Sequence, residues 1–213
     1  MILLTGFEPF GGDTANPSWA AARSAARLLQ SDGLEVRAVE LPCVFGESAT
    51  VLAEALERFQ PELVLCTGQA GGRARISLER VAINCDDARI PDNAGNQPVD
   101  EPVVAGGPAA YFTSLPVKAA LAALTAEQIP AEVSQSAGTY VCNHVFYALM
   151  HALRLHQGTR GGFVHVPYAD TQLPAGSSTP SLPAHQMAAA LAVVVRTALA
   201  TTADLKLPAG ATH

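Results

Sequence analysis

The four cysteines are the first residues in this 213-residue sequence that could do chemistry. They are Cys43, Cys66, Cys85 and Cys142, and they lack the close pairs typical of zinc sites and small disulfide frameworks. We therefore expect free thiols and no metal site. Cys66 lies within the apolar run 63–67, which favours packing in the core over reactivity.

Cys142 differs from the other three because it directly precedes an amphipathic segment, Asn143–Leu155, that predicts a helix. A thiol at a helix N-terminus faces unpaired backbone N–H groups and the positive end of the helix dipole. This setting should lower the thiol pKa, and the same N–H groups could stabilise an oxyanion. The alternative is a small residue filling a strand-to-helix turn, and position alone leaves both readings open.

A cysteine nucleophile needs a base and a group that orients the base. Among six histidines, His165 stands within the apolar strand-like segment Gly162–Val166, where its ring needs a partner. It is therefore either the base or a satisfied core histidine. Glu79 interrupts the β-branched run Ile76–Asn84 and could orient the imidazole. Its alternative is a solvated position beside Arg80.

A glycine-rich loop, Gly68–Gly72, follows another apolar strand-like segment. It lacks the Lys-Ser/Thr pair of a phosphate-binding P-loop and the spacing of a dinucleotide fingerprint. We therefore expect no cofactor. The glycines would instead let a small substrate approach the backbone closely.

Strand and helix patterns alternate along the whole sequence, which predicts an α/β fold. Asn16 and Pro17 form a helix start, as N-cap and first helical residue. The predicted helices are Ser18–Leu29, Ser48–Phe59, Val117–Leu124, Asn143–Leu155 and His185–Leu199. The predicted strands are Ile2–Thr5, Glu35–Leu41, Glu62–Cys66, Ile76–Asn84, Ala131–Ser136 and Gly162–Val166. Two segments, Asp86–Gly107 and Leu173–Pro183, read as loops rich in Pro, Gly and polar residues.

This order predicts a three-layer α/β/α sandwich with a mostly parallel or mixed central sheet, in one domain covering residues 1–213. The strand order stays open. Ligands in such folds bind at the carboxyl ends of the strands. The segments there include Gly6–Gly12, Thr67–Gly72 and Val166–Asp170, which we expect to border a functional site.

The composition argues against several classes of partner. The net charge is −6 and no cluster of basic residues occurs, so nucleic acid is not an expected partner. No window approaches the ~20 apolar residues of a membrane span, and the first residues do not form a signal peptide. We therefore expect a cytoplasmic protein without membrane contact. Charged residues are only 15% of the chain, which is compatible with surface hidden in an oligomer.

The sequence resembles the pyroglutamyl-peptidase I family of cysteine peptidases, also called pyrrolidone-carboxylate peptidases. The resemblance covers most of the chain and weakens across Leu28–Val36 and after Tyr168. The segments that carry it are Leu3–Gly12, Asn16–Ser18, Gly68–Arg73, Glu79–Asn84, Ala88–Asn93, Gly138–His144 and Gly162–Tyr168.

The resemblance implies a catalytic triad and a substrate pocket. The triad falls on Glu79, Cys142 and His165, and an arginine that supports the oxyanion falls on Arg89. The family's pocket residues fall on Phe7, Phe10, Asn16, Gln69, Ile90, Tyr140 and Val141. Position 140 is Tyr where some members have Phe, and position 43 is Cys where Thr is common, so a second thiol is expected near the substrate.

These positions predict an omega peptidase that hydrolyses the bond after an N-terminal pyroglutamyl residue of peptides and proteins. The resemblance also implies a homotetramer. One alternative is a phosphorylase-like transferase on a related fold, supported by the glycine loop with Arg73 and Arg89. Another is an inactive module that only binds pyroglutamyl peptides, although all three triad positions are intact.

Overall fold

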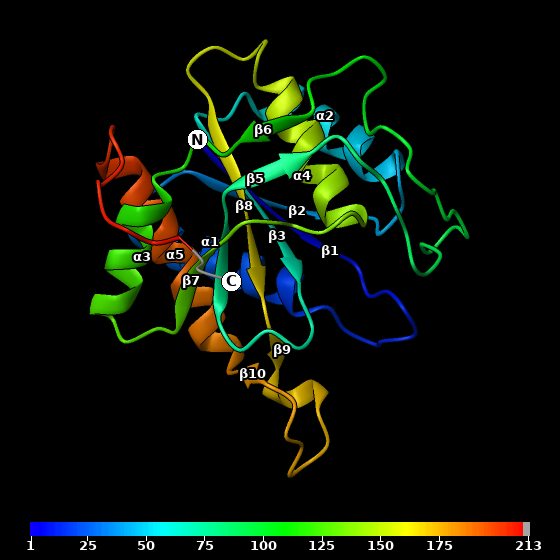
Figure 1. Ribbon diagram of the computed structural model, residues 1–213. Coiled ribbons are helices and arrows are strands. Elements are labelled where there is room, and N and C mark those ends of the chain that lie inside the picture. The colour runs from blue at the N-terminus through cyan, green and yellow to red at the C-terminus, as the bar shows by residue number, and fades with distance from the viewer. Residues whose placement is uncertain (211–213) are drawn as a thin grey trace.

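The computed structural model describes residues 1–210 and is built around one six-stranded sheet (Figure 1). The strands, in order across the sheet, are β2 (Val36–Leu41), β1 (Ile2–Phe7), β3 (Leu63–Gln69), β8 (Arg160–Val166), β4 (Ile76–Glu79) and β7 (Ala131–Ser134). The first four are mutually parallel, whereas β4 runs antiparallel to β8 and parallel to β7. The sheet is therefore mixed, which confirms the predicted fold class.

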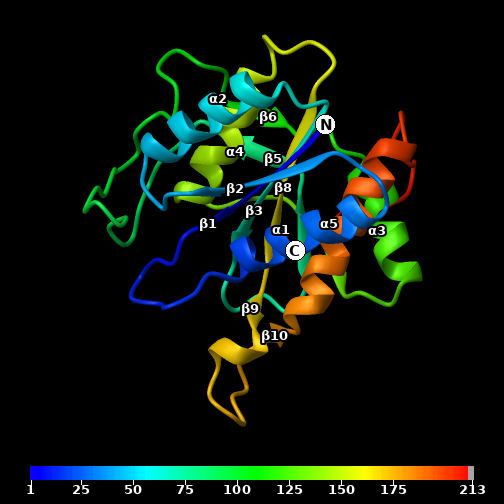
Figure 2. The same ribbon diagram turned by 180° about the vertical axis from the view of Figure 1, so that it is seen from behind.

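Helices cover both faces of the sheet, as Figures 1 and 2 show from opposite sides. One face carries α1 (Pro17–Ser31), α3 (Val117–Ala126) and α5 (Ala184–Ala200), and the other carries α2 (Glu47–Phe59) and α4 (Val141–Ala152). Within residues 1–210, none of these helices is long and apolar enough to cross a membrane.

The strands contribute to two separate cores because successive side chains point to opposite faces. In β3, Leu63 and Leu65 pack toward α1 and α5, whereas Val64 and Cys66 pack toward α2 and α4. Burial on both faces explains why these strands read as continuous apolar runs. Cys66 is fully buried, so its predicted place in the core is confirmed.

Two helix starts bear on the site. The Asn16 Oδ1 atom accepts a hydrogen bond from the Ser18 N–H at 3.0 Å, and α1 begins at Pro17, which confirms the predicted cap. Helix α4 begins at Val141, two residues before the predicted start. Cys142 therefore lies inside the first turn of α4.

The predicted strand Ile76–Asn84 is wrong as a single element. It divides into β4 and β5 (Val81–Ile83), and β5 pairs with β6 (Ala110–Phe112) in a separate two-stranded sheet. At the break, the Arg80 N–H donates to the Ser134 carbonyl while the Arg80 carbonyl accepts from Thr113. The chain thus leaves the main sheet directly after Glu79, a change of pairing partner that the apolar pattern does not record.

The chain after β8 contains short elements that the sequence did not reveal. They are β9 (Tyr168–Ala169), the single-turn 3₁₀ helix η1 (Asp170–Gln172) and β10 (Ser181–Leu182). Together they project from one end of the sheet, at the bottom of Figure 1.

The long segment Asp86–Gly107 is held in place by polar contacts, although it contains no helix or paired strand beyond an isolated bridge. The buried Asp92 carboxylate accepts hydrogen bonds from the backbone N–H groups of Phe45, Ala94 and Asn96. Burial alone would raise the pKa of Asp92, but the Asn96 side chain and these N–H groups lower it below its usual value. An ionised carboxylate therefore organises this segment.

Candidate active site

A cavity of about 200 Å³ lies at the carboxyl ends of β1, β3 and β8, the edge where the α/β order predicts a ligand. Its lining residues are Phe7, Phe10, Asn16, Cys43, Gln69, Ala70, Arg73, Ala137, Gly138, Tyr140, Cys142 and His165. A larger hollow of about 370 Å³ near Arg80 and Lys118 contains neither cysteine nor histidine. Nucleophilic chemistry therefore belongs to the first cavity.

His165 is held by Glu79 across the β4–β8 pair. Glu79 lies opposite Phe163 in the antiparallel register, and Phe163 and His165 point to the same face of β8. Glu79 and His165 are thus diagonal neighbours on one face. The His165 Nδ1 atom lies 2.7 Å from Glu79 Oε1, and both side chains are almost completely buried. This contact leaves Nε2 as the ring nitrogen available for proton transfer.

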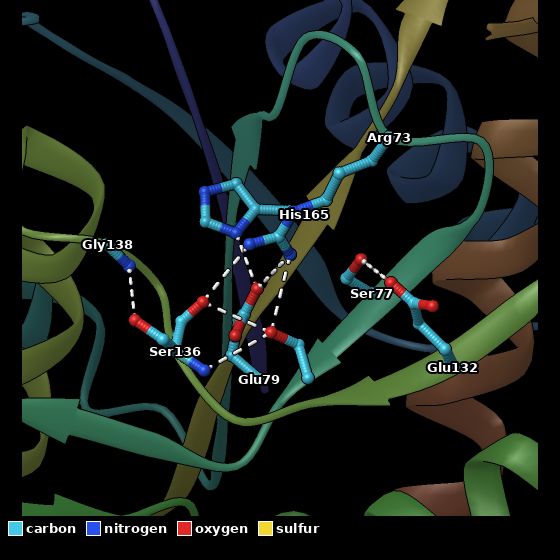
Figure 3. A network of polar contacts seen from close by, with 8 residues as sticks. Arg73, Ser77, Glu79, Glu132, Ser136, Gly138 and His165 are labelled. Carbon is cyan, nitrogen blue, oxygen red and sulfur yellow. Dashed lines mark hydrogen bonds and ion pairs between the residues drawn. The ribbon is translucent and has the colours of Figure 1, made fainter. Parts of the chain in front are cut away.

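Arg73 supports the same carboxylate from the loop after β3. Its Nη1 atom donates to Glu79 Oε1 at 2.7 Å, and Nη2 donates to the Ser136 carbonyl at 3.1 Å. Figure 3 shows the His165 ring and the Arg73 guanidinium both reaching the Glu79 carboxylate from the same side. Burial alone would raise the pKa of Glu79, but hydrogen bonding to His165 and the charge of Arg73 lower it below its usual value. Glu79 is therefore ionised and can only accept, so His165 Nδ1 carries the proton.

The Cys142 sulfur lies on this same face of the sheet, above β3. Gly68 pairs with His165 in the β3–β8 register, and a Cβ atom added at Gly68 would lie 2.6 Å from Cys142 Sγ. It would also lie 2.9 Å from the Phe163 ring. Only glycine leaves room for the thiol here. Because Gly68 has no side chain, the first turn of α4 can approach β3 and the neighbouring strand β8, which carries His165.

The start of α4 is fixed by a buried amide. The Asn143 Oδ1 atom accepts from the Ile83 N–H at 3.0 Å, and its Nδ2 donates to the carbonyls of Ile83 and Cys85. These three bonds attach α4, one residue after the thiol, to Ile83 of β5 and to Cys85. The N-cap residue Tyr140 makes no side-chain cap bond, and the first N–H groups of a helix have no intrahelical acceptor. They form a candidate oxyanion site beside Cys142.

The expected lowering of the Cys142 pKa is wrong for this structure. Burial raises the pKa of the thiol, with Cys43 and Glu79 as further raising influences, and Arg73 opposes them only in part. Burial likewise raises the pKa of Cys43 to about 12. The loss of water around the thiolate is the largest of these influences. The resting state of Cys142 is therefore a neutral thiol.

The cavity wall is apolar with a few polar groups. Phe10 and Tyr140 have ring centroids 6.1 Å apart, and the Tyr140 hydroxyl donates to the Pro91 carbonyl at 3.1 Å. The amides of Asn16 and Gln69 also line the cavity. Among the described lining residues none is acidic, and Arg73 brings a positive charge.

Three of the expected site residues, the oxyanion residue Arg89 and the pocket residues Ile90 and Val141, differ from the others in their placement. Within residues 1–210, Arg89, Ile90 and Val141 are not among those that line the cavity. Arg89 and Ile90 are exposed, on the long segment before Asp92, and Val141 is buried as the first residue of α4. The structure brings the remaining eight together. Glu79 contacts His165 without lining the cavity itself, and the lining residues among the eight are Phe7, Phe10, Asn16, Gln69, Tyr140, Cys142 and His165.

Comparison with known proteins places this geometry in a family. A model of the family described as pyroglutamyl peptidase matches residues 1–201. The chain belongs to the pyroglutamyl peptidase family. This finding confirms the predicted family and enzyme class. It supports a cysteine peptidase that removes N-terminal pyroglutamate over the transferase and binding-module alternatives.

Individual relatives are similar to this chain along almost their full length. A pyrrolidone-carboxylate peptidase of Streptomyces coelicolor is 55% identical over 217 residues, covering 100% of this chain and 99% of that protein. One of Klebsiella pneumoniae is 53% identical over 212 residues, with the same coverage. The crystal structure of Bacillus amyloliquefaciens pyroglutamyl peptidase I has 48% identity and a TM-score of 0.89, covering 96% of this chain and 98% of that one.

The sequence analysis missed the contacts of two residues that support the site. Arg73 was considered only as support for a phosphate site, yet it contacts Glu79. Gln172 lies in the region where the resemblance weakens, and its contacts to Gln69 and Ala15 are long-range. The one available signal for Arg73 was its place directly after the glycine-rich loop.

Proposed function

We propose that Cys142, His165 and Glu79 carry out hydrolysis of the bond after an N-terminal pyroglutamyl residue. The observation that carries this proposal is the 2.7 Å contact between His165 and Glu79 at the wall of the cavity that contains Cys142. A nucleophile, a base and a group that orients the base are the three parts that acyl transfer requires.

The reaction begins from the protonated Cys142 thiol. Cys142 Sγ attacks the carbonyl carbon after the ring while its proton moves to His165 Nε2, and Glu79 stabilises the imidazolium that results. The tetrahedral oxygen accepts hydrogen bonds from the free N–H groups at the start of α4. Arg89 supports this oxygen in the family pattern, and we retain that role as part of the proposal.

The intermediate then collapses in two stages. His165 gives its proton to the leaving amine, the C–N bond breaks, and a thioester to Cys142 remains. Water attacks the thioester as His165 takes one of its protons, and the C–S bond breaks. Free pyroglutamate leaves, and the proton returns to the Cys142 sulfur.

The pocket chemistry supports pyroglutamate as the first residue. Its lactam ring is flat and uncharged, which suits a wall formed by Phe7, Phe10 and Tyr140. An ordinary N-terminus would bring an ammonium group into a cavity without a carboxylate and beside Arg73. We extend this role to Asn16 and Gln69, whose amides can bond the lactam, with Ile90 and Val141 as flanking groups.

The test is hydrolysis of a fluorogenic pyroglutamyl amide by the wild-type chain, Cys142→Ser, Cys43→Ser and Cys66→Ala. Loss of a nucleophile that acts with a base costs several orders of magnitude in kcat. We expect this loss for Cys142→Ser alone, with an unchanged circular dichroism spectrum. Wild-type turnover by Cys142→Ser would refute the assignment.

The setting of the reaction is also part of the proposal. Family resemblance and the low content of charged residues support a homotetramer in the cytoplasm, acting on peptides and proteins that begin with pyroglutamate. We further propose that residues 1–213 form one pyroglutamyl-peptidase domain, since the family match extends over residues 1–201.

A further inference from the structure

The side chain of Gln172 joins three segments next to the cavity. It lies on η1, where its Oε1 atom accepts from the Ala169 N–H at 2.8 Å. Its Nε2 atom donates to the Ala15 carbonyl at 3.2 Å and to Gln69 Oε1 at 3.1 Å. Ala15 directly precedes Asn16, so Gln172 contacts or adjoins both amide residues of the cavity wall.

The chemistry of these contacts fixes which way the Gln172 amide points. A backbone N–H can only donate, so the Gln172 atom facing Ala169 is oxygen. A carbonyl can only accept, so the atom facing Ala15 is nitrogen. Reversing the amide would place donor against donor and acceptor against acceptor. The Gln69 atom that faces this nitrogen must therefore be its oxygen.

The orientation of Gln69 follows in turn. Its oxygen is engaged by Gln172, so the amide nitrogen is the polar atom left to face the cavity that Gln69 lines. Gln69 is only 8% exposed, which limits competition from water. The cavity thus presents an N–H donor at the end of β3. The lactam ring of pyroglutamate has one strong acceptor, its ring carbonyl oxygen.

We propose that Gln172 is a positioning residue that sets the polarity of the Gln69 amide, so that Gln69 donates to the lactam carbonyl. This inference rests on the proposed function. One chain of hydrogen bonds sets the donors and acceptors. The Ala169 N–H donates to Gln172 Oε1, Gln172 Nε2 donates to Gln69 Oε1, and Gln69 Nε2 donates to the lactam carbonyl. Without Gln172 the Gln69 amide can rotate by half a turn, which would aim its oxygen at the lactam oxygen.

The test uses Gln172→Glu, which keeps the size of the side chain and the acceptor for Ala169 but removes both donated hydrogen bonds at neutral pH. Gln172→Met removes all hydrogen bonding without adding charge. The control is Asp170→Asn, which alters the contact of the same turn with Ser181, at 2.6 Å, and leaves Gln69 untouched.

Lactam binding is measured without turnover. Iodoacetamide labels Cys142, 2-pyrrolidone protects it, and mass spectrometry of the Cys142 peptide gives the dissociation constant of the lactam. KM and kcat for a pyroglutamyl amide are measured in parallel. A failure of the proposed function would appear as a wild-type chain that binds 2-pyrrolidone but cleaves nothing.

We expect Gln172→Glu to weaken 2-pyrrolidone binding and raise KM by about tenfold or more, with a smaller change in kcat. Gln172→Met should show a smaller loss, and Asp170→Asn should match the wild type. Unchanged lactam binding in both Gln172 variants would overturn the inference. Equal losses in Asp170→Asn would overturn it too, because the effect would then be one of loop stability. Failure of 2-pyrrolidone to protect Cys142 in the wild-type chain would show that the cavity does not bind the lactam, and this would overturn the inference as well.

Discussion

Substituting Gly68 by alanine adds one methyl group at the point where α4 approaches β3. The added carbon would lie 2.6 Å from Cys142 Sγ and 2.9 Å from the Phe163 ring. Ordinary contacts between such atoms are about 3.5–4 Å. The sulfur or the ring must therefore move by about 1 Å, and the ring lies 4.9 Å from that of His165, centroid to centroid. Either movement alters the geometry between thiol and imidazole.

The size of the effect follows from this displacement. Misplacing a reacting group by about 1 Å costs on the order of 100-fold in rate. Overpacking a buried site costs about 1–3 kcal/mol of stability. We therefore expect Gly68→Ala to lower kcat by about 100-fold while the chain still folds.

The matched control is Gly161→Ala on the neighbouring strand β8. A Cβ there would lie 2.8 Å from a Leu153 methyl group and 3.1 Å from a Leu149 methyl group, away from the thiol. Hydrolysis of a pyroglutamyl amide and thermal unfolding are measured for both variants. We expect similar losses of stability and a loss of kcat in Gly68→Ala alone. If both variants retain wild-type kcat, the close approach at Gly68 does not set the position of the nucleophile.

Two further predictions concern substrate choice and pH. A peptide beginning with pyroglutamate should be cleaved at least about 1,000-fold faster than the same peptide beginning with glutamine, because the cavity offers no carboxylate for an ammonium group; comparable rates in a chromatographic assay would contradict this account of the pocket. The pKa of Glu79 is lowered in the folded chain, so its carboxylate form is kept until the pH falls through that lowered value. Removing the guanidinium in Arg73→Met raises the Glu79 pKa, and the acid limb of kcat/KM should move to higher pH. The same limb should stay in place in Arg75→Met, whose exposed side chain lies on the same loop.

Local chemistry made several features predictable from the sequence. Asn16 followed by Pro17 marks a helix start because both residues suit a chain that has not yet formed helical hydrogen bonds. Glu79 and His165 were candidates because each is a titratable group in an apolar strand, which needs a partner. The structure provides each as the partner of the other.

Other features depend on contacts between distant segments. The apolar run 76–84 gave no sign that β4 pairs with β8 while β5 pairs with β6, since both pieces have the same strand pattern. The pKa of Cys142 depends on how many groups close over the sulfur, and a position at a helix start does not specify that. Arg89 and Ile90 show the same limit, because a matching motif does not specify whether a side chain lines the cavity, and neither is among the described lining residues.

Strand β8 occupies the middle of the sheet although it begins only at Arg160. While the chain is being synthesised, β1, β2 and β3 can assemble early, but the free edge of β3 stays unpaired until β8 has left the ribosome. An exposed apolar edge of this kind favours association with other chains. His165 arrives on the same strand, so an incomplete chain contains Cys142 without its base. Peptidase activity can therefore appear only after β8 has completed the sheet.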